Sequence, residues 1–254
     1  MGELVVIMSD RLELAGYLAR PSASAATGAG RYGLVLSHGF PEGPQNAAVV
    51  GKTFPELADR LADDANWTVL TFNFRGTGES KGDFSLAGWL ADLRAAVDHL
   101  LQEEGVEGVW LSGFSAGGAL SICAAGEDER VRGVATFAAP ADFNEWASDA
   151  RRFLAQARAV GVIRTRTFPS DPDAWARELR EVKPLSLIGK IPPRPLLVVH
   201  GANDAVVPML DARALADAAE GQLELRILAA ASHQLRHDPR AIAILLGWLD
   251  RQLV

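Results

Sequence analysis

Cysteine is almost absent from this chain of 254 residues, which contains only Cys123. A single cysteine excludes an intramolecular disulfide and any metal site built from several cysteine thiolates. No continuous apolar run approaches the roughly 18 residues that a membrane-spanning helix needs. The opening MGELVVIMSDRLEL lacks the basic start and the cleavage site of a secretory signal peptide, and it indicates a strand instead. We therefore expect no membrane span and a cytoplasmic location.

An excess of positive charge is also lacking. The chain has 25 Lys and Arg against 32 Asp and Glu, which gives a formal net charge of −7 at pH 7. A surface that binds nucleic acid needs a stripe of basic residues to neutralise phosphates, and the sequence has no such stripe. The negative charge mainly supports solubility. We expect no nucleic-acid partner, and we leave a homodimer open.

Short β-rich runs alternate with helical stretches along the chain, which is typical of a parallel sheet covered by helices. Strands are predicted near 3–8, 12–19, 33–38, 67–73, 107–112, 131–138, 195–200 and 223–229. Helices are predicted near 46–63, 85–104, 116–126, 208–220 and 238–252. The first two strands are joined tightly through MSDR and should form an antiparallel hairpin at the sheet edge. The sequence thus predicts one α/β domain over residues 1–254, with a mostly parallel sheet of eight strands.

One long stretch interrupts this alternation. More than fifty residues without a strand pattern follow the strand that ends at Ala138. That length is too great for a plain connection and too small for a domain, so we expect a small helical cap at 141–190. Trp146, Phe153 and Val160 are predicted to line the substrate pocket from this cap. The alternative is that the same apolar face only packs the cap onto the core.

The segment GFSAG places Ser115 between a buried strand and a helix. G-x-S-x-G is the pattern of a nucleophile elbow, in which the strand reverses sharply and holds the serine in a strained backbone conformation. Gly113 and Gly117 are needed there because larger side chains would collide with the neighbouring backbone. The alternative is a glycine-rich turn in which Ser115 only caps the helix. We predict that Ser115 is a nucleophile.

A serine hydroxyl needs a base, and the base needs an orienting acid, before the oxygen can attack a carbonyl at neutral pH. Both residue types follow Ser115 along the chain. Asp204 comes after the apolar run LLVVHG, and His233 comes after LELRILAAAS. Because each follows a predicted strand, the three side chains should converge at one edge of the sheet. Ser115, His233 and Asp204 are the predicted nucleophile, base and acid.

Other residues compete for these roles. Asp142 is the rival acid, although helix capping accounts for it, and a role in a turn is the alternative for Asp204. His237 lies four residues after His233, but the pair lacks the glutamate and the third ligand of an H-E-x-x-H zinc site, so no metal is expected. Structural roles are expected for the remaining histidines, which are His38, His99 and His200.

The tetrahedral intermediate of acyl transfer needs N–H donors for its oxyanion. One candidate is the N–H of Ala116, directly after the nucleophile. The second should come from the loop after GLVLSHG, where Gly39 permits a close approach of the backbone. The predicted oxyanion hole therefore consists of the N–H groups of Phe40 and Ala116.

Taken in order, SHGF, NFRGTGES, GFSAGG, HGANDAVVP and ASH resemble segments of the α/β-hydrolase superfamily, and the resemblance spans nearly the whole chain. NFRGTGES resembles a turn after the fourth strand of many members, where Arg75 would brace the neighbouring loops. One departure is AAASHQ, because many members have glycines before the histidine, whereas alanines and Ser232 stand here and should stiffen the loop. The resemblance implies an α/β-hydrolase fold and hydrolase activity without a metal or organic cofactor.

These residues and the resemblance predict a carboxylesterase-type serine hydrolase that acts on a small-molecule ester with a short to medium acyl chain. A serine nucleophile argues against dehalogenase and epoxide-hydrolase chemistry, which this fold performs with aspartate, and against the dienelactone type, which uses cysteine. Several alternatives stay open. They are an aminopeptidase or amidase, for which Glu42 is the candidate amine-binding group, a thioesterase or acyltransferase, and a slow hydrolase-like ligand receptor.

Overall fold

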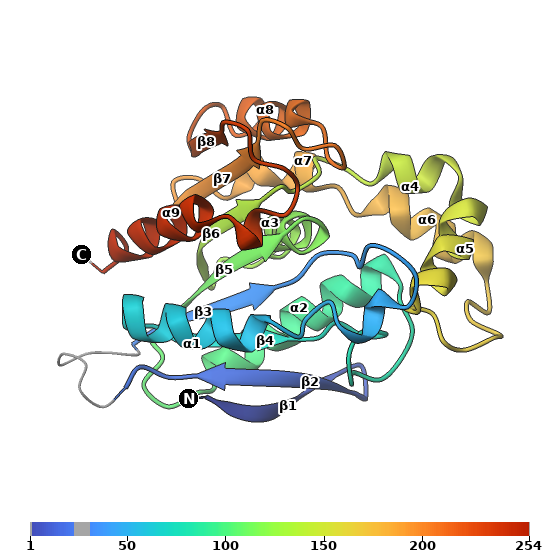
Figure 1. Ribbon diagram of the computed structural model, residues 1–254, viewed down its shortest axis with the longest axis horizontal. Helices are drawn as coiled ribbons and strands as arrows, with labels where there is room; N and C mark the ends of the chain where they lie inside the picture. Colours follow the sequence, from blue (N-terminus) through green and yellow to red (C-terminus); the bar gives the residue numbers. More distant parts are fainter. Residues whose placement is uncertain (1, 23–30, 254) are drawn as a thin grey trace.

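Eight strands form one sheet in the order β1-β2-β4-β3-β5-β6-β7-β8 in the computed structural model, which describes residues 2–22 and 31–253 (Figure 1). The strands are β1 (Glu3–Ser9), β2 (Leu12–Ala19), β3 (Tyr32–Ser37), β4 (Thr68–Phe72), β5 (Gly108–Phe114), β6 (Val131–Phe137), β7 (Leu196–Gly201) and β8 (Glu224–Leu228). β2 is antiparallel to both β1 and β4, and every other pair is parallel. Asp10 and Arg11, both with positive φ, make the tight turn between β1 and β2. The predicted sheet and its antiparallel edge hairpin are confirmed.

Helices cover both faces of the sheet and enclose two apolar cores (Figure 1). One face carries α1 (Phe54–Ala65) and α9 (Pro239–Asp250), and the other carries α2 (Leu86–Leu101), α3 (Ala116–Glu127), α7 (Pro184–Leu187) and α8 (Met209–Ala218). Leu61 and Trp248 are buried in the first core, and Leu93 and Leu120 in the second. Within the described residues, no helix has the length and apolar character needed to cross a membrane.

The helix predicted over 46–63 begins later than expected. Asn46–Ala48 form only a 3-10 turn, and α1 starts at Phe54. Pro55 lies in the first turn of α1, where its fixed φ and missing N–H favour the start of a helix. Gln45 has a left-handed backbone with φ of 61°, which also separates the 3-10 turn from a regular helix. The segment between the turn and α1 is therefore an irregular loop.

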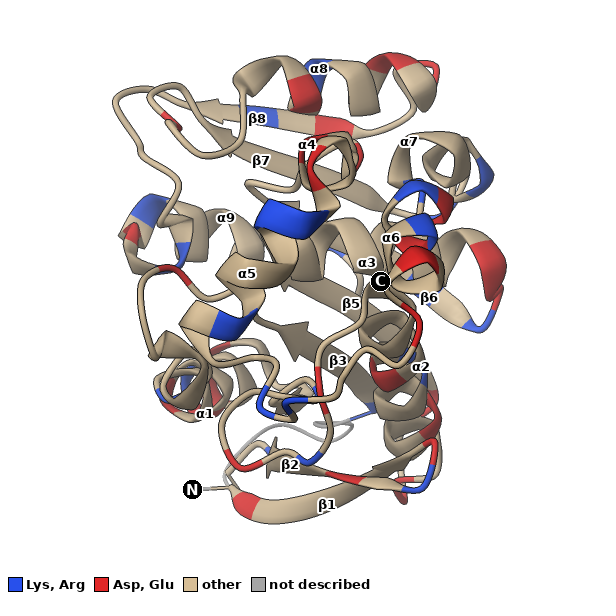
Figure 2. Ribbon diagram, turned by 90° about the vertical axis from the view of Figure 1, so that its right-hand side faces the viewer, with Lys and Arg blue, Asp and Glu red and all other residues tan. Residues whose placement is uncertain are grey.

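Three helices occupy most of the predicted cap: α4 (Asn144–Ser148), α5 (Ala150–Val160) and α6 (Pro172–Glu181). They lie together at the end of the molecule toward which the parallel strands point (Figure 2). Hydrogen bonds tie them to the loop after β4. The Trp175 indole N–H donates to the carbonyl of Phe84 at 3.1 Å, and Arg164 Nη2 donates to the carbonyl of Gly76 at 3.0 Å. The cap is thus fixed to the domain by polar contacts as well as by apolar ones.

A buried ion pair holds the loop after β4 in place. Arg75 donates to Asp92 Oδ1 from Nε at 3.0 Å and from Nη2 at 2.7 Å, and its backbone N–H donates to Oδ2 at 2.8 Å. The Asp92 side chain is completely buried within α2. A second carboxylate, that of Asp10, accepts a hydrogen bond from Arg75 Nη2 at 2.9 Å. Arg75 therefore joins the loop after β4 to α2 and to the β1–β2 turn.

We expect Asp92→Ala to lower the free energy of unfolding by about 3–5 kcal/mol, because it removes the buried carboxylate partner of a largely buried guanidinium and leaves only the exposed carboxylate of Asp10. Urea unfolding followed by circular dichroism measures the change. Asp64→Ala is the matched control, since it breaks an exposed pair with Arg60 and should cost less than about 1 kcal/mol. Equal losses in the two variants would show that the buried pair has no special role.

Candidate active site

Ser115 stands at the sharp junction between β5 and α3. Its backbone has φ of 52° and ψ of −125°, a region that residues other than glycine rarely adopt. A Cβ on Gly113 would overlap the backbone of Gly117, and a Cβ on Gly117 would overlap the carbonyl oxygen of His38. The Ser115 N–H donates to the carbonyl of Phe137 at 2.8 Å, which anchors the turn to β6. The local geometry is that of the elbow expected from the sequence.

Asp204 and His233 are in direct contact. His233 Nδ1 lies 2.8 Å from Asp204 Oδ2, and the other carboxylate oxygen accepts the N–H groups of Val206 at 2.9 Å and Val207 at 2.8 Å. Burial alone would raise the pKa of the Asp204 carboxyl. The hydrogen bonds from His233 and from the two backbone N–H groups outweigh burial and hold this pKa below its ordinary value.

The Asp204 contact also determines which nitrogen of His233 carries the proton. A carboxylate only accepts hydrogen bonds, so Nδ1 must be the protonated nitrogen of a neutral His233. The lone pair of Nε2 is then free to accept a proton. Oε1 of the Glu42 carboxylate lies 4.0 Å from that nitrogen. The unprotonated nitrogen of His233 is thus on the side of Glu42.

A second histidine supports the acid-bearing loop. His200, at the end of β7, is completely buried, and its Nε2 lies 3.0 Å from the carbonyl of Val207 and 3.4 Å from Asp204 Oδ2. Because a carbonyl oxygen only accepts, this Nε2 carries the proton. His200 therefore joins both ends of the Asp204 loop and has the structural role predicted for it.

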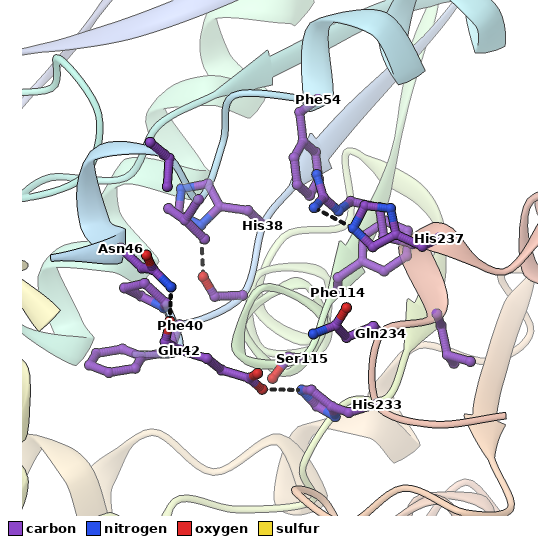
Figure 3. Close-up of a pocket in the computed structure, with 16 residues that line it drawn as sticks. His38, Phe40, Glu42, Asn46, Phe54, Phe114, Ser115, His233, Gln234 and His237 are labelled. Atoms are coloured by element: carbon purple, nitrogen blue, oxygen red, sulfur yellow. Dashed lines mark hydrogen bonds and ion pairs between the residues drawn. The ribbon is translucent and has the colours of Figure 1, made fainter. Parts of the chain in front are cut away.

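Ser115 and His233 face one cavity of about 330 Å³ (Figure 3). In Figure 3 the hydroxyl of Ser115, the imidazole of His233 and the carboxylate of Glu42 lie close together, while Phe54 and His237 lie at the other end. The lining consists of His38, Gly39, Phe40, Pro41, Glu42, Asn46, Val49, Val50, Phe54, Phe114, Ser115, His233, Gln234, Leu235, Arg236 and His237. The predicted nucleophile and base thus share a pocket that is large enough for a small molecule.

The loop after β3 passes directly beside the nucleophile. A Cβ on Gly39 would lie 2.8 Å from the Cβ of Ser115, so only glycine permits this approach. The carbonyl of Gly39 lies 2.8 Å from His38 Nδ1, and the Phe74 N–H donates to His38 Nε2 at 3.3 Å. His38 is therefore protonated on Nδ1, and it holds the carbonyl of the Gly39–Phe40 peptide. The N–H of Phe40 points the opposite way, since a trans peptide sets these two groups on opposite sides.

The two predicted oxyanion donors both lack a hydrogen-bond acceptor among the described residues. Within residues 2–22 and 31–253, neither the Phe40 N–H nor the Ala116 N–H donates to a protein acceptor. Ala116 is the first residue of α3, whose N-terminal end carries partial positive charge. Both groups are therefore available to a negatively charged oxygen, as an oxyanion hole requires.

The rival acid lies elsewhere. Just before α4, the carboxylate of Asp142 accepts two hydrogen bonds from Asn144, one from its backbone N–H at 2.8 Å and one from its side-chain amide at 2.6 Å. His237 is the acceptor of a 2.8 Å hydrogen bond from Arg236 Nη2 and does not contact Asp204. The contacts of both residues are local, whereas Asp204 and His233 contact each other directly.

The predicted substrate-binding residues of the cap do not line this cavity. Phe153 and Val160 are buried in the apolar core, and Trp146 packs against it. The ring of Phe40 lies 5.1 Å from that of Trp146 and 5.3 Å from that of Phe153. These cap residues therefore contact the loop that carries Phe40, and substrate binding by them stays a prediction.

Part of the pocket wall consists of residues that the sequence did not indicate. Val49, Val50 and Phe54 come from the segment expected to be a regular helix, and Arg236 comes from the 3-10 turn Leu235–His237 after the predicted base. Proximity to His233 was the only available signal for Arg236. For residues 49–54, Pro55 indicated where the helix begins and could have revealed the loop before it.

The comparisons with known proteins concern the family and the fold of the chain. Residues 33–161, just over half of the chain, match a family model described as alpha/beta hydrolase fold. The uncharacterized protein YfhR of Escherichia coli O157:H7 is 26% identical over 147 residues, which are 57% of this chain and 45% of YfhR. The chain thus matches less than half the length of such curated relatives.

Solved structures resemble the chain over nearly its whole length. Est1E from Butyrivibrio proteoclasticus has a TM-score of 0.71 at 17% identity, with 98% of this chain and 97% of Est1E covered. The esterase domain from a Rhodothermus marinus protein has a TM-score of 0.69 at 22% identity, with 99% and 97% covered. At these sequence identities, the similarity shows a shared fold and no more.

We expect the stability of the protein to depend on pH through His38. Burial lowers the pKa of His38 to about 4, against its ordinary value of 6.5. His38 is therefore protonated near pH 6.5 in the unfolded chain but stays neutral at that pH in the folded protein. The free energy of unfolding is therefore highest above pH 6.5 and falls as the pH drops toward 4. Lowering the pH from 7 to 5 should reduce the free energy of unfolding by about 2 kcal/mol through His38.

Urea unfolding of the wild type and of His38→Asn at pH 7 and pH 5 measures this effect. Asparagine retains an N–H donor for the Gly39 carbonyl but does not titrate, so the variant should lose about 2 kcal/mol less than the wild type over this range. An identical loss in both proteins would mean that His38 does not titrate in this range.

Proposed function

The chain belongs to the alpha/beta hydrolase family, and on that premise we propose that it is a serine hydrolase of carboxylic esters that acts through an acyl-enzyme. One observation carries the proposal. His233, hydrogen-bonded to Asp204 at 2.8 Å, turns its other nitrogen toward the cavity that also contains the strained Ser115. A nucleophile, a base and an orienting acid in this relation are the components of acyl transfer.

Acylation begins when Ser115 Oγ attacks the carbonyl carbon of the ester. His233 Nε2 accepts the proton of the hydroxyl, and the ionised Asp204 stabilises the imidazolium that results. The carbonyl oxygen becomes an oxyanion and accepts hydrogen bonds from Phe40 and Ala116. The bond to the alcohol then breaks, His233 returns its proton to the leaving alkoxide, and the acyl group stays on Ser115.

Deacylation repeats these steps with water. His233 Nε2 removes a proton from a water molecule, whose oxygen attacks the acyl carbon. The same two N–H groups accommodate the second oxyanion. When this intermediate collapses, Ser115 Oγ leaves and regains its proton from His233, and the carboxylic acid is released.

The proposed substrate is an ester because of the chemistry available and the character of similar proteins. A serine nucleophile with a histidine base suffices for carbonyl esters, and solved neighbours of this fold include Est1E and an esterase domain. Carboxylesterase-type specificity for short to medium acyl chains fits the volume of about 330 Å³.

The cap is proposed to affect this reaction through Phe40. The side chain of Phe40 packs against Trp146 and Phe153, while its backbone N–H is the proposed oxyanion donor. Shrinking either cap residue would loosen the loop that carries the donor. In this proposal Trp146 and Phe153 influence the substrate by way of the oxyanion loop, and Val160 by packing α5 onto the core.

We expect Ser115→Ala and His233→Ala to lower kcat for a nitrophenyl acetate ester by roughly 10⁴- to 10⁶-fold, because nucleophile and base act as a unit. A fluorophosphonate probe should label the wild type at Ser115 only. Labelling of Ser115→Ala at the wild-type rate would contradict the assignment of the nucleophile.

We expect Asp204→Asn to lower kcat by about 10⁴-fold, since it disturbs the tautomer and orientation of His233. Asp142→Asn is the matched control, because it makes the same change in the rival acid and should leave kcat within about twofold. Both are measured with the same ester. A larger loss in Asp142→Asn than in Asp204→Asn would transfer the acid role to Asp142.

A further inference from the structure

Arg236 is a cation in the wall of the active-site cavity, and no carboxylate among the described residues forms an ion pair with it. It lines the same pocket as Ser115. Within the described residues, its side chain forms one hydrogen bond, from Nη2 to His237 Nε2 at 2.8 Å, and its Nη1 is buried without an acceptor. Its guanidinium lies 4.9 Å above the ring of Phe54. A guanidinium has five N–H donors, so most of its hydrogen-bonding capacity is unused.

Other partly buried arginines of the chain are satisfied differently. Arg75 forms a buried ion pair with Asp92. Arg194 donates to five backbone carbonyls, those of Ala125, Asp128, Val131, Lys190 and Ile191. Arg236 is therefore unusual among them. A charged group withdrawn from water without acceptors costs free energy, and a bound anion would offset that cost.

Burial lowers the pKa of Arg236 below its ordinary value. An arginine nevertheless stays protonated at neutral pH, because its ordinary pKa lies far above neutrality. The contact over the ring of Phe54 and the hydrogen bond to His237 restrict the orientation of the guanidinium. A cation of this shape is suited to a carboxylate, which accepts two parallel N–H groups from guanidinium.

We infer that Arg236 binds a free carboxylate on the substrate, so that the preferred esters are hemiesters of dicarboxylic acids. The inference rests on the proposed ester hydrolysis and adds the class of substrate to it. The ester end would lie at Ser115, and the free carboxylate would lie at the end of the cavity formed by Phe54 and His237 (Figure 3).

Glu42 restricts the length of such a substrate. Its carboxylate lies 4.0 Å from His233 Nε2 and therefore beside the reacting centre. A second carboxylate close to the ester would be repelled by Glu42, whereas one on a longer spacer would be drawn to Arg236. Adipate and suberate hemiesters should thus be better substrates than the succinate hemiester.

The experiment measures kcat/KM for nitrophenyl hemiesters of succinate, adipate and suberate beside neutral nitrophenyl esters of matched chain length. The proteins are the wild type, Arg236→Gln, Arg236→Lys and Arg213→Gln. Arg213, exposed on α8 and outside the cavity lining, is the matched control for the loss of one positive charge. The wild type is also assayed at low and high salt.

We expect the wild type to prefer the adipate hemiester to its neutral counterpart. Arg236→Gln should lose about 10- to 100-fold in kcat/KM for that hemiester, the range for a hydrogen bond between charged groups. Neutral esters should change less than threefold, Arg236→Lys should retain part of the preference, and Arg213→Gln should retain all of it. The wild-type preference should also fall as salt rises, which tests the inference even without a folded variant.

Two outcomes would overturn the inference alone. One is a wild type that hydrolyses neutral esters but shows no preference for hemiesters. The other is an equal loss on both substrate classes in Arg236→Gln. A wild type that hydrolyses neither class would overturn the proposed function, and the inference with it.

Discussion

The active site depends on the close approach of two backbone segments that only glycine allows. Gly113 and Gly117 let β5 turn into α3, and Gly117 also lies against the carbonyl of His38 on the loop after β3. Gly39, on that loop, lies against Ser115 itself. The positive φ of Ser115 costs about 1–3 kcal/mol, which the surrounding sheet and helix must offset. The strained serine thus lies directly beside the loop that carries Phe40.

Three histidines near this contact differ in burial and in hydrogen-bond partners. His38 is held neutral by burial, so it can fix the Gly39 carbonyl without placing a positive charge inside the core. His200 braces the loop of Asp204. His233 is paired with that carboxylate and partly open to the cavity, and it is the histidine that we propose exchanges protons. Identical side chains thus serve different purposes because their burial and partners differ.

Much of this arrangement could be predicted from the sequence. Continuous apolar runs identify the central strands, because only strands buried on both faces lack polar positions. The glycines around Ser115 reveal a steric requirement, and Asp204 and His233 follow strands whose ends meet at one sheet edge. Local residue types dictate these features, so no tertiary information is needed.

Other features depend on tertiary contacts that no local pattern encodes. Residues 49–53 appeared helical by composition, but the chain there turns back to line the cavity. Arg236 has no distinguishing neighbours in the sequence, and its lack of a carboxylate partner emerges only when the whole fold is assembled. Phe153 and Trp146 have the apolar spacing of a pocket wall, but that spacing is equally suited to packing against Phe40.

The central claim is that Ser115 carries the acyl group during turnover. Its most direct test is mass spectrometry of the protein quenched in acid during the hydrolysis of a nitrophenyl ester, followed by peptide mapping. The account predicts a mass increase equal to one acyl group, located on the peptide that contains Ser115. A protein that turns over the ester with no such adduct, or with the adduct on another residue, would contradict it.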